Sequence, residues 1–165
     1  MQGLRRSIDH GRVIAIGHGL GGQLAVWAAS RPDLPSQAPG FAPRVRPIGA
    51  VSLSGVLDLV AADTDRVAPL GILLGGHAAE YPERYAWTSP TMLNSGAVPV
   101  LAVHGIDDDV VPIRYGRNYS NAATARHEPV EFRELPGVGH FDLLDPGHPR
   151  WAEIVDWLEK RFTSG

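Results

Sequence analysis

The stretch that most constrains this chain is VIAIGHGLGG, residues 13–22. It begins as an apolar run without alternation, which is typical of a strand buried on both faces of a parallel sheet. A turn made almost entirely of glycine and histidine follows, and a helical run begins at about residue 21. In a strand, sharp turn and helix of this kind, a G-x-S-x-G sequence holds a nucleophilic serine at the apex of the turn. Here the frame is GHGLG, so Gly19 occupies the apex and the serine is absent.

Three more strands are predicted downstream. Residues 48–53 and 98–103 are continuous apolar runs, and residues 130–135 alternate imperfectly. Helical patterns cover residues 21–30, 113–126 and 151–162, with the apolar residues Leu24, Trp27, Tyr115, Tyr119, Ala122, Trp151, Ile154, Val155, Leu158 and Phe162. Strands separated by helices, with connections long enough to cross over, predict an α/β fold: a parallel sheet of about four strands with helices on both faces.

The chain is predicted to be one domain over residues 1–165, with two segments outside this pattern. Residues 2–9 have the character of the end of a helix. Residues 56–97 form a long irregular connection, and a connection of that length in a compact domain is usually functional. We therefore predict a lid or pocket wall there; the alternative is one or two helices packed on the sheet.

Composition excludes several classes of function. A net charge of −3, with scattered arginines, argues against an electrostatic nucleic-acid binder. No apolar run approaches the length of a membrane span, and the polar first residues lack the apolar core of a signal peptide. The absence of cysteine excludes disulfides and thiolate metal sites and suits a reducing compartment, so we expect a cytoplasmic protein.

Reactive side chains follow three of the predicted strands, at the sheet edge where ligands of open α/β sheets bind. They are the glycine turn around Gly19, the acidic run of residues 107–109, and His140 in the sequence GVGH. An acid and then a histidine, downstream of the turn, is the order of a catalytic triad whose serine would stand at residue 19. His140 could instead be a loop histidine bonded to backbone, and the aspartates could be turn residues.

No cofactor or metal site is predicted. His104 follows a strand and is expected to satisfy a local hydrogen bond. A metal site built from His104 and the aspartates has no support, because neither H-x-x-x-H nor H-E-x-x-H occurs.

Several motifs together resemble the α/β-hydrolase superfamily, in particular bacterial esterases of the kynurenine formamidase-like and prolyl oligopeptidase-like groups. They are GHGLGGQLAVWAA, SLSGVLDL, LLGG with PERYAWTSP, PVLAVHGIDDDVVP and LPGVGHFDLLDP. The family pattern HGxxDxxVP implies Asp108 as the catalytic acid, and GxGHF implies His140 as the base. The nucleophilic serine corresponds to Gly19, and the backbone N–H of Leu20 to one oxyanion donor. The implied substrates are small acyl esters or amides.

The sequence departs from this family pattern in two respects. Without a hydroxyl at Gly19, His140 has nothing to deprotonate and the covalent route cannot start. The N-terminal half of the family, which carries the second oxyanion donor, has no counterpart before Val13. The chain is therefore predicted to be inactive or very weak, and to resemble the C-terminal half of the fold. It is a hydrolase disabled at Gly19, a non-catalytic binding module, or one half of a split hydrolase.

The first strand also yields an expectation about partners. In the family this strand is central, whereas here nothing upstream covers its outer edge. An exposed apolar edge favours pairing and aggregation. We expect self-association or an N-terminal partner through this strand, and no nucleic-acid or membrane partner.

Overall fold

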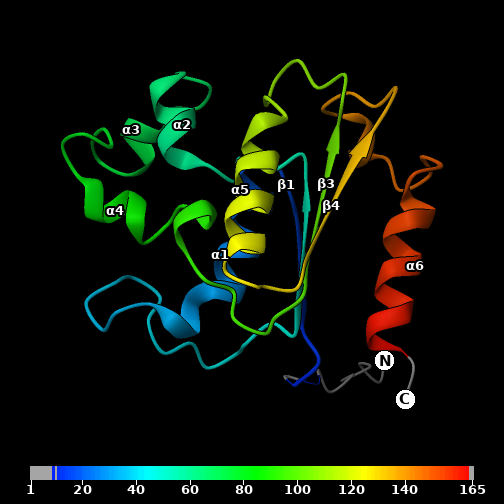
Figure 1. The fold of residues 1–165 in the computed structure, drawn as a ribbon, viewed down its shortest axis with the longest axis horizontal. Coiled ribbons are helices and arrows are strands. Elements are labelled where there is room, and N and C mark those ends of the chain that lie inside the picture. The colour runs from blue at the N-terminus through cyan, green and yellow to red at the C-terminus, as the bar shows by residue number, and fades with distance from the viewer. Residues whose placement is uncertain (1–8, 10, 164–165) are drawn as a thin grey trace, which may run out of the picture.

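A computed structural model describes residue 9 and residues 11–163. Within them lies one four-stranded sheet of the order β1-β2-β3-β4, with every neighbouring pair parallel (Figure 1). The strands are β1 (Ile14–His18), β2 (Gly49–Leu53), β3 (Val100–Gly105) and β4 (Val130–Leu135), and the long helices are α1 (Leu20–Ser30), α5 (Arg114–Ala125) and α6 (Trp151–Phe162). The predicted α/β class and parallel sheet are confirmed. The expected end of a helix at residues 2–9 lies almost wholly outside the described residues.

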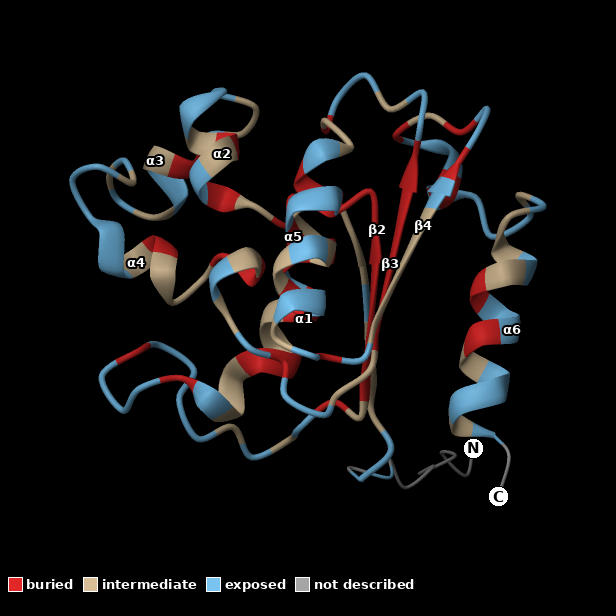
Figure 2. Cartoon of the chain, in the orientation of Figure 1, coloured by how far each residue is buried: buried red, intermediate tan, exposed pale blue. Residues whose placement is uncertain are grey.

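Helices cover both faces of the sheet, as predicted. Helix α6 lies on one face, while α1 and α5 lie on the other (Figure 1). The α6 side is packed by Val51, Leu53, Leu101, Val103, Leu135, Val138, Leu143, Ile154 and Trp157. The opposite core consists of Val26, Ala29, Ala50, Leu57, Val100, Ala102, Tyr119 and Ala123. Strands β2 and β3 are buried along their whole length between these two cores (Figure 2).

The helix patterns predicted the helices themselves more accurately than their buried faces. Leu24 is 55% exposed on α1, and Val155 is 43% exposed on α6, where Trp157 is buried instead. On α5 the fully buried alanine is Ala123, not Ala122. A contact depends on which neighbouring element reaches a helix position, and spacing along one helix does not contain that information.

Residues 56–97 fold into short helices. They are α2 (Leu59–Thr64), α3 (Leu70–Leu73), α4 (Pro82–Ala86) and a 3-10 turn, η2 (Pro90–Met92). These helices pack around Leu70 and Tyr85 and contact α5 through Tyr115. The segment therefore packs against a helix rather than directly against the sheet. Further 3-10 turns are η1 (Arg31–Asp33) and η3 (Asp142–Leu144). A role as lid or pocket wall stays a prediction.

Strand β1 is an edge of the described sheet. Among the described residues it pairs only with β2. Its side chain Ile16 is 45% exposed, because α6 covers the neighbouring strands and not this one. Ile16 on β1 and Leu24 on α1 both leave apolar surface near this edge, which has no partner strand other than β2 among the described residues.

Candidate active site

The apex of the first turn is held by backbone contacts. Gly19, between β1 and α1, has φ 57° and ψ −122°, a conformation that side-chain-bearing residues rarely adopt. Its N–H donates to the carbonyl of Leu53 at 3.0 Å, and its carbonyl accepts from Val56 at 3.2 Å. Gly17 permits the sharp return, since a Cβ there would stand 2.0 Å from the carbonyl oxygen of Gly21. The glycines of the motif thus fix a sharp turn at the carboxyl end of β1, with the apex residue Gly19 buried.

Two other strand-end loops are joined to each other by backbone hydrogen bonds. The N–H of Ile106 donates to Leu135 at 2.9 Å, and the N–H of Asp107 donates to Val138 at 3.1 Å. A Cβ on Gly105 would lie 2.0 Å from the carbonyl oxygen of Val138, so only glycine allows this approach. The loop after β3, which carries Asp108, is therefore fixed against the loop after β4, which carries His140.

Asp108 and His140 form a hydrogen-bonded pair. The Nδ1 of His140 donates to Oδ2 of Asp108 at 2.8 Å. The Asp108 side chain is fully buried, and that of His140 is 7% exposed. Because Nδ1 carries the proton in this bond, Nε2 is the ring nitrogen left to act as a base.

The remaining contacts of Asp108 keep its carboxylate charged. Its Oδ1 accepts from the N–H groups of Val110 at 3.0 Å and Val111 at 2.7 Å. Burial alone raises the pKa of the Asp108 carboxyl, but these backbone bonds and the bond from His140 outweigh burial and hold the pKa below its ordinary value. Of the acidic run 107–109, Asp107 and Asp109 are exposed, and only the middle member faces the histidine.

His104 is a second imidazole on the same carboxylate. It lies within β3 and is 1% exposed. Its Nε2 donates to the carbonyl of Val111 at 2.8 Å and lies 3.3 Å from Oδ2 of Asp108. Burial lowers the pKa of His104, which keeps the ring neutral. The predicted local hydrogen bond is present, and the contact with Asp108 is one that the sequence pattern did not reveal.

Gly19 faces the free side of His140. A Cβ built on Gly19 would lie 3.7 Å from Nε2 and 3.9 Å from Cε1 of His140, which is ordinary van der Waals contact. Leu20 begins α1, where the first N–H groups of a helix have no partner within that helix. The structure thus brings together the four positions singled out from the sequence: Gly19, Leu20, Asp108 and His140.

His18, which precedes the apex, binds the loop that carries His140. Its Nε2 donates to the carbonyl of His140 at 2.8 Å, and the two ring centroids are 4.3 Å apart. This contact supports the backbone of His140, and no sequence signal indicated it. Two serines near the turn are no substitute for the missing hydroxyl, because both are enclosed: Ser52 on β2 is 1% exposed, and Ser54 after it is fully buried.

The described part of the chain offers neither a cluster of metal ligands nor a membrane-spanning helix. Within it, no three histidine, cysteine or acidic side chains gather in a way that could hold a metal ion. None of its helices has the length and apolar character required to cross a membrane.

Comparison with known proteins identifies the family. The model of the prolyl oligopeptidase family (Peptidase_S9) matches residues 4–165. A probable carboxylic ester hydrolase, LipM, from Mycobacterium tuberculosis is 32% identical over 154 residues, which cover 87% of this chain and 35% of LipM. The α/β hydrolase domain-containing protein WAV2 from Arabidopsis thaliana is 26% identical over 165 residues, covering 94% of this chain and 49% of WAV2. The chain thus spans between a third and a half of these two relatives.

Solved structures show the same fold. A truncated form of a carbohydrate esterase from gut microbiota superposes with a TM-score of 0.75 at 21% identity, covering 95% of this chain and 62% of that one. An acetyl ester-xyloside bifunctional hydrolase from Caldicellulosiruptor lactoaceticus gives a TM-score of 0.69 at 23% identity, over 93% of this chain and 58% of that one. Together with the family match and the geometry of the turn, these similarities show that the chain belongs to the prolyl oligopeptidase family of α/β-hydrolases, among esterase-like relatives.

Proposed function

We propose that this chain carries the acid and base of a carboxylic ester or amide hydrolase site whose nucleophile is missing at Gly19. The observation that carries the proposal is the 3.7 Å between the Cβ position of Gly19 and Nε2 of His140. The Oγ of a serine here would stand one bond beyond that Cβ, which would place it within reach of a hydrogen bond to Nε2. Asp108 would hold the ring in the tautomer a general base needs, and His140 would take the hydroxyl proton as Oγ attacks the acyl carbon.

The chain as given would then be inactive or very weak. Loss of a triad serine lowers kcat by about 10⁶ in a hydrolase where it has been measured. The Leu20 N–H would still stabilise an oxyanion, but a single oxyanion donor accounts for only a fraction of the rate that is lost with the serine. Glycine at the apex relieves backbone strain, so the turn survives the loss of its chemistry.

The direct test of this function is to supply the nucleophile. Gly19→Ser should be assayed on short acyl esters, alone and together with an N-terminal segment taken from a longer relative such as LipM. Gly19→Ser with His140→Ala is the matched control, because it keeps the serine and removes its base. Activity that appears with the segment and disappears in the control supports the proposal. Absence of activity in every combination, with the fold intact by circular dichroism, refutes it and favours a non-catalytic binding module.

A second candidate function is suggested by the edge of the sheet. Strand β1 pairs on one side only among the described residues, and Ile16 and Leu24 leave apolar surface beside it. We expect this edge to bind a second copy or an N-terminal partner strand, as in one half of a split hydrolase. Small-angle scattering tests self-association directly, because a stable, monodisperse monomer across the concentration range would refute it. Titration with the N-terminal segment of LipM tests binding of a partner strand.

A further inference from the structure

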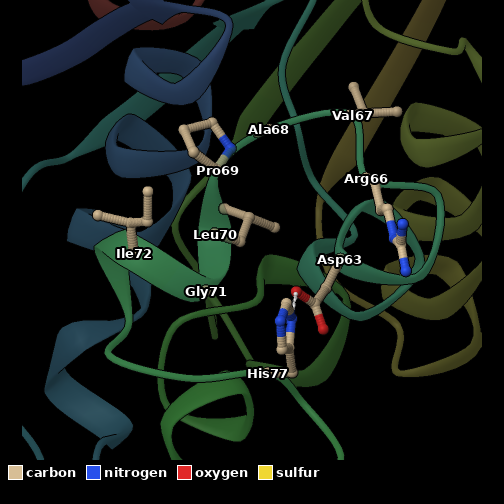
Figure 3. A pocket seen from close by; sticks show the side chains of 9 residues that line it. All are labelled: Asp63, Arg66, Val67, Ala68, Pro69, Leu70, Gly71, Ile72 and His77. Atoms are coloured by element: carbon tan, nitrogen blue, oxygen red, sulfur yellow. Dashed lines mark hydrogen bonds and ion pairs between the residues drawn. The ribbon is translucent and has the colours of Figure 1, made fainter.

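A cavity of about 520 Å³ lies in the segment of short helices and shares no residue with the Gly19 site (Figure 3). Its apolar wall includes Val67, Leu70 and Ile72, from the turn after α2 and from α3. Leu70 is fully buried and forms its floor, whereas Ile72 is 87% exposed at its margin. An apolar side chain so exposed beside a cavity leaves surface that a ligand can cover.

A histidine stands at the polar end of this cavity, fixed by a buried carboxylate. The Nδ1 of His77 donates to Oδ1 of Asp63 at 2.9 Å, and Oδ2 of Asp63 accepts from the N–H of Ala78 at 2.9 Å. The Asp63 side chain is only 9% exposed, but that of His77 is 66% exposed. Gly71 lets the ring lie close, since a Cβ there would stand 3.0 Å from Cε1 of His77. With Nδ1 used by Asp63, the Nε2 of His77 is left for a ligand.

A second cation lines the same cavity. Arg66 follows α2 in a left-handed conformation, φ 56°, and its N–H bonds back to the carbonyl of Asp63. Its exposed guanidinium makes none of the ion pairs formed among the described residues. In the view of Figure 3 the carboxylate of Asp63 lies between this guanidinium and the imidazole of His77. The carboxylates of Asp63 and Glu80 offset the charges of Arg66 and protonated His77, since Glu80 accepts from the N–H of His77 at 3.0 Å. The donors left for a ligand are the guanidinium of Arg66 and the Nε2–H of His77.

We propose that this cavity binds a small carboxylic acid, with the carboxylate held by Arg66 and by the Nε2–H of His77 and the apolar chain lying against Leu70 and Ile72. A guanidinium and an imidazolium both donate charge-assisted hydrogen bonds to carboxylate oxygens. The apolar wall recognises a chain of several carbons and not a bare inorganic anion. The site needs no nucleophile, so it does not depend on the function proposed for Gly19.

Binding should strengthen as the pH falls. The hydrogen bond that His77 donates to Asp63 raises the pKa of His77, the charge of Glu80 raises that pKa further, and the charge of Arg66 lowers it. Tyr85, on α4, also belongs to this group, and its pKa is raised to about 12, so it stays neutral in this range. The protonated ring that donates through Nε2 therefore persists to a higher pH than in a free imidazole, and it is lost as the pH rises through the raised pKa of His77.

The experiment is an NMR titration of the chain with hexanoate at about pH 6, followed through the imidazole of His77 and the backbone of residues 63–77. We expect saturable shifts there and no shift at His140. Hexan-1-ol, which keeps the apolar chain and lacks the charge, should bind about tenfold more weakly. Arg66→Gln and His77→Gln should each weaken hexanoate binding by about the same factor, and a rise to about pH 8 should weaken binding to the native chain but not to His77→Gln.

Arg46→Gln is the matched control, because it removes one exposed positive charge outside the cavity. Three results would overturn the proposal. One is the absence of saturable shifts, the second is equal binding of hexan-1-ol and hexanoate, and the third is an effect of Arg46→Gln as large as that of Arg66→Gln. Circular dichroism of each variant separates loss of binding from loss of fold.

Discussion

The effect of a side chain at Gly19 on stability can be worked out from the turn itself. The φ of 57° and ψ of −122° cost a residue with a Cβ about 1–3 kcal/mol. No steric term is added, since the nearest atom to that Cβ would be 3.7 Å away. Replacing glycine also lowers the conformational entropy of the unfolded chain, which stabilises the folded state by about 0.4–1 kcal/mol. With the middle of each range, Gly19→Ala should lower the free energy of unfolding by about 1.3 kcal/mol.

Gly19→Ser should be less destabilising than Gly19→Ala, because both carry the same backbone strain and only serine can bond to His140. That hydrogen bond is worth about 1 kcal/mol. Urea unfolding measures the difference, and in a chain of this size it corresponds to about 2–4 °C in Tm. Adding His140→Ala to both variants should abolish the difference, which makes a double-mutant cycle.

Two outcomes would refute this reasoning. If Gly19→Ala is as stable as the native chain, the turn does not impose the strain derived from its dihedral angles. If serine and alanine at residue 19 are equally stable, Oγ does not reach Nε2 and the proposed triad geometry is wrong.

Three further predictions concern residues that hold the site in place. Gly17→Ala should abolish cooperative unfolding or cost more than about 3 kcal/mol in urea unfolding, because its Cβ would meet the carbonyl oxygen of Gly21 at 2.0 Å. Gly21→Ala is the control: its Cβ would meet nothing within 4 Å, so the same experiment should show little change. His104→Phe should cost about 1–3 kcal/mol in urea unfolding, because it leaves the buried carbonyl of Val111 without its donor; retained stability would mean that the bond contributes little. The pKa of Asp108 is held below its ordinary 3.8, so its stabilising contribution is complete above that pH and is lost as the pH falls through the folded-state pKa. In an acid titration monitored by circular dichroism, the stability of Asp108→Asn should depend less on pH in this range than that of the native chain. An unchanged acid transition would contradict a stabilising role for the Asp108 carboxylate.

Much of the fold could be predicted from the sequence. Continuous apolar runs such as residues 48–53 are typical of strands buried on both faces, and their alternation with helical patterns predicts parallel pairing. The glycine spacing around Gly19 predicted a sharp turn, because few other residues reach its dihedral angles. The motifs around Asp108 and His140 predicted which side chains would meet, and the structure joins them at 2.8 Å.

Other features could not be predicted from these patterns. The buried face of α1 was misjudged at Leu24, since exposure there depends on what lies beside β1 and not on the helix period. The fold of residues 56–97 was left open between a lid and packed helices, because its helices are too short to show a clear period. The cavity with Arg66 and His77 went unnoticed for the same reason.

The sequence by itself determined the α/β architecture, the sharp turn and the absence of a hydroxyl at residue 19, because each follows from local properties: burial pattern, permitted dihedral angles and side-chain chemistry. Only the tertiary structure decided that His104 shares the carboxylate of Asp108, that His18 binds the backbone of His140, and that His77 is fixed by Asp63. These contacts join residues from different loops and strands. Their distances are set by how the sheet and helices pack, and no spacing along the chain encodes them.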